Sequence, residues 1–482
     1  MAKINASLIL PFIIFVLSIF FRTYQLDKYP YFSTNEALLS WRSYSLSQIG
    51  TDETGRRYPF IFSSFEGYQL PVSTYIIIPF VKIFGLNINT VRLPFVLISL
   101  FSLLCLYFLL CKWTNDKNIP LLTLLVLALS PGYLWFTRVI NSVNLALSLL
   151  VIGLFLLQNQ KKSPFYLTGA LLCFVASLYT NQITWLVVIP LLFLYAWYRK
   201  HRQILIICGL LFIALLPLLY YYLKLPQIAL NIKQNDLSIF SDITTINSIN
   251  ALRGEDVSSK RLIWGTVFHN KVYQGVRFLS SYLQQLNPRL YFASGDQNPL
   301  HGLSNFGPLL VVFLPFFLSG LKTLYSRNYR LFIFAFFWCL ITTLPSALSF
   351  PNQNQEKLLL VLPMLALVVG YGLSTIKKQF LPILAVFIVI NTTIILYDAL
   401  VKEPFRQPEK HSTGLIEQIA ATSIRNPDKT INMSDADIPD PAPLLLFFSK
   451  YDPQLFSSQT PSFGYRSTIR NVGNVAVVGK EK

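Results

Sequence analysis

The amino-acid sequence predicts an all-α polytopic membrane protein with about eleven transmembrane helices. Of its 482 residues, 53% are hydrophobic and only 13% are charged, whereas soluble domains carry about 25% charged residues. Apolar runs of about twenty residues recur along the chain, long enough to cross a hydrocarbon core of about 30 Å. Because backbone polar groups in lipid must be paired within their own segment, we expect these runs to be helices.

The expected spans are the apolar runs at 5–22, 92–112, 119–136, 143–158, 164–180, 183–198, 203–223, 306–321, 331–349, 358–376 and 379–397. With the N-terminus inside, the cytoplasmic loops hold thirteen Lys and Arg residues and one acidic residue, Asp116. Cytoplasmic loops of membrane proteins are enriched in Lys and Arg. The sequence therefore predicts a multi-pass protein of the plasma (inner) membrane with a cytoplasmic N-terminus and an extracytoplasmic C-terminal domain.

Three long segments then lie on the non-cytoplasmic side. Two are loops of a transmembrane domain at 1–397, namely residues 23–91 and 224–304. The third is the tail at 398–482, whose Pro, Asp, Ser and Lys content predicts a small α/β extracytoplasmic domain. The apolar stretch Thr74 to Phe84 is too short to span the membrane and is expected in its interface.

Composition excludes other classes. The formal net charge of +18 comes largely from Lys and Arg in short gaps between apolar runs, which is a topology pattern, so we expect no nucleic-acid partner. All five cysteines lie inside apolar runs, so no disulfide framework is expected in the outer loops. The sequence shows no Cys/His metal-ligand spacing.

Polar residues of the outer segments are the candidates for a site at the membrane surface. They are Asn35 and Glu36 in the first segment, Arg138 and Lys357 in short turns, and Asp296 and His301 in the second segment. Carboxylates with cations suit an enzyme that holds a lipid phosphate and activates a hydroxyl. Each has an alternative: Glu36 as a solvated loop residue, the two cations as interfacial anchors, and Asp296 and His301 as turn formers.

The order of motifs adds a resemblance. The chain resembles the GT-C membrane glycosyltransferases of the protein O-mannosyltransferase and aminoarabinose transferase superfamily over nearly its whole length. The motifs that carry the resemblance are Phe21 to Pro30, Thr34-Asn-Glu-Ala37, Gly85 to Pro94, Thr137-Arg138, Tyr179 to Gln182, Gly295-Asp-Gln-Asn-Pro-Leu-His301, Lys357 to Pro363 and Lys450-Tyr-Asp-Pro453.

The resemblance implies transfer of a sugar from a polyprenyl-phosphate donor to a glycan, lipid or protein acceptor. It also implies an Asp-Glu pair as the base and basic residues at outer helix ends as phosphate ligands. This chain departs from that pattern. Asn35 replaces the Asp, and a neutral amide cannot accept a proton. Ser142 replaces a second acid, and Asn354 with Lys357 stands for His-x-x-Arg.

Two functions stay open. In the first, the chain is a glycosyltransferase in which Glu36 or Asp296 supplies the carboxylate, and Lys357, Arg138, His301 and Asn354 bind the substrate phosphate. In the second, it is a catalytically impaired member, a pseudoenzyme that binds lipid-linked sugar or a membrane partner. No cofactor is indicated with certainty, and a divalent metal is an open alternative. A transporter is the weaker interpretation, since few ionisable residues lie mid-helix.

Overall fold

The structure, a computed structural model, describes residues 6–64, 67–200, 204–224, 239, 243–259, 269–294, 306–349, 355–402, 408–434, 441–458 and 471–478. Asp296, His301 and Asn354 lie outside these residues, as does most of the segment at 224–268. The described chain is largely helical, and the few strands are two to four residues long.

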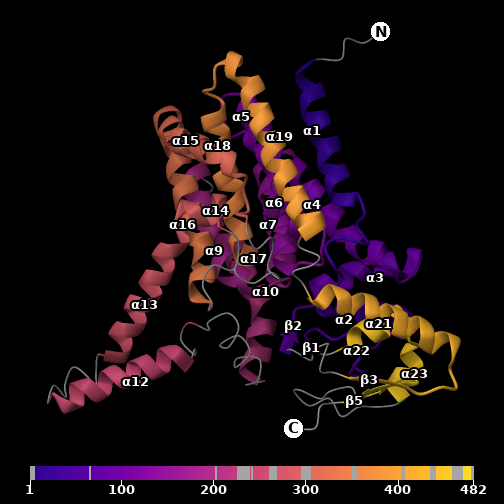
Figure 1. Cartoon of the computed structure of the whole chain (residues 1–482). Helices are drawn as coiled ribbons and strands as arrows, with labels where there is room; N and C mark the ends of the chain where they lie inside the picture. Colours follow the sequence, from indigo (N-terminus) through magenta and orange to yellow (C-terminus); the bar gives the residue numbers. More distant parts are fainter. Residues whose placement is uncertain are drawn as a thin grey trace. The chain divides into compact units, whose positions relative to one another are not determined.

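The helices are labelled in Figure 1. They are α1 (Ala6–Thr23), α2 (Thr34–Gln48), α3 (Val72–Phe84), α4 (Ile88–Cys111), α5 (Asn118–Ala128), α6 (Pro131–Thr137), α7 (Ser142–Asn159), α8 (Pro164–Leu178), α9 (Ile183–Arg199), α10 (Ile204–Lys224), α12 (Ile243–Ser258), α13 (His269–Gln285), α14 (Pro288–Phe292), α15 (Leu314–Arg327), α16 (Tyr329–Leu348), α17 (Gln355–Leu358), α18 (Leu362–Leu373), α19 (Leu381–Tyr397), α21 (Pro408–Arg425), α22 (Ala442–Phe448) and α23 (Pro453–Ser458).

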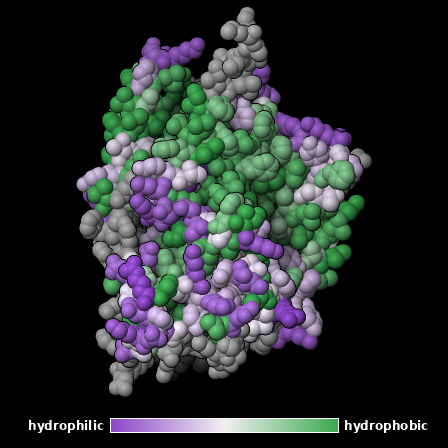
Figure 2. All heavy atoms as spheres, turned by 90° about the vertical axis from the view of Figure 1, so that its right-hand side faces the viewer, coloured by the Kyte–Doolittle hydropathy of each residue, from purple (hydrophilic) through white to green (hydrophobic). Residues whose placement is uncertain are grey.

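The chain is a multi-pass α-helical membrane protein. Within the described ranges, six helices are long and apolar enough to cross a membrane, or seven if the bent pair α5 and α6 forms one span. The face shown in Figure 2 carries large apolar areas, as lipid contact requires. Each of the eleven expected runs overlaps helical residues, but α8, α9 and α15 have 15, 17 and 14 residues. At 1.5 Å per residue these are shorter than the hydrocarbon core, and the count of eleven stays a prediction.

Two expected spans differ from the structure. The run 119–136 is broken, and α5 and α6 meet at 67° where Pro131 opens the second helix. A proline there lacks the N–H that a continuous helix would need. The run 306–321 is helical only from Val311, in a short 3-10 turn that leads into α15. The apolar stretch at 74–84 lies in α3, which has 13 residues, and its expected place in the membrane interface stays a prediction.

The chain forms two compact units. The first comprises residues 1–103, 134–148 and 393–482, and the second comprises 104–133 and 149–392. In the first unit the hairpin β1 (Phe62–Ser64) with β2 (Gly67–Gln69) is antiparallel. A three-stranded sheet has the order β3 (Ile431–Ser434), β5 (Val475–Val478), β4 (Asn471–Val472), with β3 parallel to β5. The predicted boundary at 397/398 remains a prediction.

The C-terminal segment packs on the first outer segment within the first unit. Helices α2, α21 and α22 lie side by side in Figure 1. The Trp41 indole N–H donates to the carbonyl oxygen of Tyr451 at 3.1 Å. The Phe32 and Phe447 rings have centroids 4.5 Å apart. The tail therefore holds the helix that carries Asn35 and Glu36.

Glycines allow close helix packing in the second unit. A Cβ on Gly372 of α18 would lie 1.9 Å from the carbonyl oxygen of Phe316 in α15, and one on Gly320 would lie 1.9 Å from that of Val368. Small residues let membrane helices approach closely, which substitutes for a hydrophobic driving force between helices in lipid. These two positions therefore fix α15 against α18.

Residues predicted for cytoplasmic loops gather at one end of the second unit. Asn328 donates its side-chain amide to the carbonyl oxygen of Trp113 at 3.4 Å, and the Arg330 guanidinium donates to that of Trp197 at 2.8 Å. Lys112 donates to the Asn159 side chain. Four of the predicted inner loops thus share one side, as the span order requires. Which side of the membrane they face stays a prediction.

Candidate functional site

Glu36 is a buried, fully engaged carboxylate in the first turn of α2. Its exposed fraction is 3%. One oxygen accepts from Arg92 Nε at 2.9 Å and from the Ile140 backbone N–H at 3.0 Å. The other accepts from Arg92 Nη2 at 2.7 Å and from the Ser33 N–H at 3.2 Å, which completes a capping box with Ser33. The alternative of a solvated Glu36 is therefore wrong.

Arg92 ties α4 to the turn between α1 and α2. Besides Glu36, its guanidinium donates to the carbonyl oxygens of Leu26 at 2.8 Å, Pro30 at 2.9 Å and Tyr31 at 3.1 Å. The side chain is fully buried. Because a buried charge is tolerated only when it is paired and hydrogen-bonded, Arg92 needs both Glu36 and these carbonyl groups.

Arg138 makes a second set of contacts with the same turn. Its guanidinium donates to the carbonyl oxygens of Phe21, Tyr24, Gln25 and Tyr29, with the closest Tyr29 contact at 2.8 Å. Burial, and then the nearby Arg92 charge, lower the pKa of Arg138 to about 10, so the group is charged at neutral pH. These carbonyl groups include the unpaired end of α1, which a cation stabilises.

Together these residues form what we call the arginine junction: Arg92, Arg138, Glu36 and the carbonyl groups of residues 21–31. The motifs around Phe21, Glu36, Arg92 and Arg138 lie far apart in sequence, and each contributes to this one network. The junction therefore gives a structural reason why some of these motifs occur together in the sequence. Both predicted roles, Glu36 as base and Arg138 as phosphate ligand, compete with these contacts.

The Arg138 contacts make a measurable prediction. Arg138→Met should lower the free energy of unfolding by roughly 1–3 kcal/mol for each carbonyl group left buried and unpaired. Thermal unfolding of the purified protein in detergent measures it. The matched control is Arg57→Met, since Arg57 is exposed in the same unit and should change little. Equal melting temperatures for the two variants would show that the carbonyl contacts contribute no stability.

Asn35 is exposed beside the junction and begins a separate hydrogen-bond chain. Its Oδ1 accepts from Gln69 Nε2 at 2.8 Å, and Gln69 Oε1 accepts from Arg42 Nη1 at 2.7 Å. Arg42 forms a buried ion pair with Glu53 and lies over the Phe62 ring at 4.6 Å. Sequence reasoning missed Arg42, Glu53 and Gln69. The only sequence signal for this group was Arg42, a basic residue in the middle of the predicted outer segment at 23–91.

The segment from Gly50 to Gly55 is a turn. Gly50 and Gly55 have φ of 73° and 78°, values that glycine adopts without strain. The Asp52 carboxylate accepts from the N–H groups of Thr54 and Arg56, each at 2.9 Å. It also forms an ion pair with the half-exposed Arg56 side chain at 3.2 Å.

Lys357 belongs to the second unit, in the short helix α17, and its exposed fraction is 7%. The side chain is therefore buried, and its role as phosphate ligand or interfacial anchor stays a prediction. Asp296, His301 and Asn354, the remaining predicted site residues, lie outside the described residues. Over the ranges that are described, no group of three or more His, Cys, Asp or Glu side chains is arranged to hold a metal ion.

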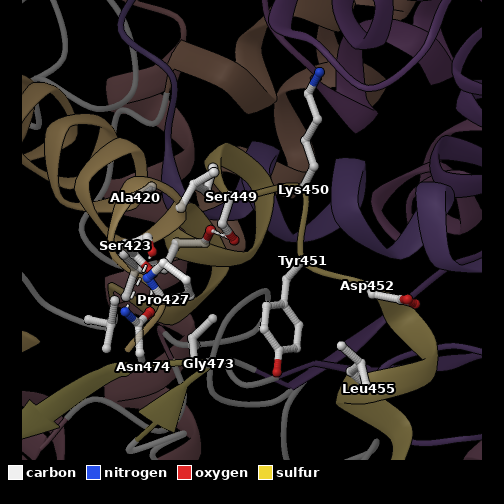
Figure 3. A pocket seen from close by; sticks show the side chains of 14 residues that line it. Ala420, Ser423, Pro427, Ser449, Lys450, Tyr451, Asp452, Leu455, Gly473 and Asn474 are labelled. Atoms are coloured by element: carbon white, nitrogen blue, oxygen red, sulfur yellow. Dashed lines mark hydrogen bonds between the residues drawn. The ribbon is translucent and has the colours of Figure 1, made fainter. Parts of the chain in front are cut away.

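A cavity of about 350 Å³ lies in the C-terminal segment between α21, α22 and β4 (Figure 3). Ser423 and Asn474 on its wall are bonded to each other, and Lys450 extends away from the other labelled side chains. Asp452 accepts from the Gln454 N–H at 2.8 Å at the start of α23. The Lys450 to Pro453 motif thus forms the turn between two helices, α22 and α23.

Comparisons with solved structures find similar chains. ArnT from Cupriavidus metallidurans in the apo state is 11% identical, with a TM-score of 0.49 over 95% of this chain and 77% of that one. The archaeal oligosaccharyltransferase AglB from Archaeoglobus fulgidus, in complex with an inhibitory peptide and a dolichol-phosphate, is also 11% identical, with a TM-score of 0.49. This chain spans 61% of AglB.

A structure of ArnT bound to undecaprenyl phosphate matches with a TM-score of 0.44 and 13% identity. No protein-family model and no curated protein matches the chain.

Proposed function

We propose that this protein is a membrane glycosyltransferase that takes a sugar from a polyprenyl-phosphate donor and passes it to an acceptor on the non-cytoplasmic side. The observation that carries the proposal is the arginine junction. Motif residues from four places in the sequence, Phe21, Glu36, Arg92 and Arg138, form one buried network there. The network holds the first turn of α2, where the exposed residue 35 stands, in a fixed position.

The roles of the site residues follow from their contacts. Glu36 and Arg138 are positioning residues, because the junction uses their hydrogen-bonding groups. Lys357 is the proposed phosphate ligand, together with His301 and Asn354. Asp296 is the proposed general base, which takes the proton of the acceptor hydroxyl while the polyprenyl phosphate leaves the sugar. Glycan, lipid and protein acceptors all fit this chemistry.

A second candidate function has its own support. In a non-catalytic member, the protein would bind a lipid-linked sugar without transferring it. Three carboxylates of the first outer segment are engaged in structural contacts: Glu36 with Arg92, Glu53 with Arg42 and Asp52 with its own turn. Position 35 holds an amide, which cannot act as a base.

The test uses the full-length protein in nanodiscs with a polyprenyl-phosphate sugar labelled in the sugar. Membrane glycolipids, glycans and peptides serve as acceptors. We expect the label to move to one acceptor class with release of polyprenyl phosphate, and no transfer from the corresponding nucleotide sugar. Binding of the donor without transfer to any acceptor would support the second candidate. Absence of binding would contradict both.

A further inference from the structure

The hydrogen-bond chain behind Asn35 has a fixed direction. Arg42 lies at its buried end, where the guanidinium donates to both oxygens of Glu53 and, through Nη1, to Gln69. A guanidinium is a donor only and has no acceptor atom. The atom of Gln69 that faces Arg42 must therefore be its oxygen, whichever way a side-chain amide is assigned.

The direction of hydrogen-bond donation, from Arg42 to Gln69, continues from Gln69 to Asn35. With its oxygen on Arg42, Gln69 turns its NH₂ group toward residue 35, at 2.8 Å from the Asn35 side chain. An NH₂ group is a donor only, so Asn35 must meet it with Oδ1. The Nδ2 group of Asn35 is left on the opposite side. Within the described part of the chain it has no protein partner, and the residue is exposed.

We infer that Asn35 is a ligand-binding donor, which Arg42 and Gln69 orient so that its Nδ2 group faces the phosphate of a lipid-linked sugar. This inference rests on the proposed function. It makes residue 35 a hydrogen-bond donor, whereas a base would accept a proton. An NH₂ group donates an N–H bond to an oxygen atom and takes no proton from it. Residue 35 also lies in the first turn of α2, where the helix dipole favours an acceptor with negative charge.

Two substitutions each place an oxygen atom where Asn35 now presents its NH₂ group, and they do so in different ways. Asn35→Asp keeps an oxygen for Gln69 and presents a second carboxylate oxygen outward, which repels a phosphate. Gln69→Glu leaves residue 35 unchanged but replaces the NH₂ group by an oxygen. Asn35 then turns its Nδ2 group inward to the Glu and presents Oδ1 outward. A role for Asn35 in packing alone would not predict the second effect.

The experiment measures equilibrium binding of polyprenyl phosphate, and separately of inorganic phosphate, to the full-length protein in phosphatidylcholine nanodiscs. We expect Asn35→Asp and Gln69→Glu each to weaken polyprenyl phosphate binding by about tenfold or more, since a charge-assisted contact is lost. Gln69→Met, which only frees the amide, should weaken it about three- to tenfold. Melting temperatures confirm that each variant is folded.

Matched controls carry the same chemical changes elsewhere in the first unit. Asn87→Asp keeps the oxygen that accepts from the Thr90 N–H at 2.9 Å, and Gln48→Glu adds a charge at the exposed far end of α2. Both should bind like the unaltered protein.

The possible failures are distinguishable. If the unaltered protein binds polyprenyl phosphate and all three site variants bind it equally well, the inference is wrong and the proposed function stands. If the unaltered protein binds none, the proposed function fails and the inference with it. A rise in transfer rate in Asn35→Asp would show a base position and overturn the donor role. A change in inorganic phosphate binding alone would assign the site to a soluble phosphate instead.

Discussion

Replacing Arg92 with Met is expected to lower the free energy of unfolding by about 3–5 kcal/mol, the usual effect of removing one partner of a buried ion pair. Glu36, which is 3% exposed, would be left as an uncompensated buried charge. The carbonyl groups of Leu26, Pro30 and Tyr31 would lose their donor. Since folded domains are stable by only about 5–15 kcal/mol, little folded protein should accumulate.

The double variant Arg92→Met with Glu36→Met tests the reason for this loss. Because the second substitution removes the unpaired charge, the double variant should unfold at a higher temperature than Arg92→Met alone. Arg56→Met is the control, since it breaks an ion pair whose Arg side chain is 44% exposed, and such pairs contribute about 0–1 kcal/mol. A double variant no more stable than Arg92→Met would show that the carbonyl contacts, and not Glu36, need the arginine.

Much of the fold could be predicted from the sequence because membrane helices are local. Every expected apolar run overlaps helical residues, since a helix satisfies its own backbone groups. The errors fall where proline acts. Pro131 separates α5 from α6, and residues 306–310, which contain Pro308, precede the helix that was expected to start there. Counting the apolar residues in a stretch of sequence does not detect either interruption.

The site was harder to predict because its contacts are long-range. Glu36 meets Arg92 across 56 residues and the Ile140 N–H across 104. Glu36 and Arg138, a carboxylate and a cation expected near a membrane surface, therefore suggested a substrate site, although their hydrogen-bond partners are within the protein. Nothing in a sequence shows that a guanidinium is directed at carbonyl groups, as in Arg138. The Arg42 to Gln69 contact, which orients Asn35, likewise needs the β1–β2 hairpin to be folded.

The last large effect that we expect distinguishes the two candidate carboxylates, Asp296 and Glu36. Asp296→Asn should lower the transfer rate about 10²- to 10⁴-fold, the usual contribution of a general base, and leave the melting temperature unchanged. Glu36→Gln should do the reverse. It leaves Arg92 buried without a counter-charge, so the melting temperature falls while the folded fraction keeps its transfer rate.

Rates are measured with labelled polyprenyl-phosphate sugar and divided by the folded fraction, which size-exclusion chromatography gives. Asp27→Asn is the matched control, since Asp27 is an exposed carboxylate of the first outer segment and its loss should change neither quantity. A folded Glu36→Gln protein without transfer, beside an active Asp296→Asn protein, would make Glu36 the base in spite of its contacts. The carboxylate would then have to leave Arg92 during turnover, and the arginine junction would open with each sugar transferred.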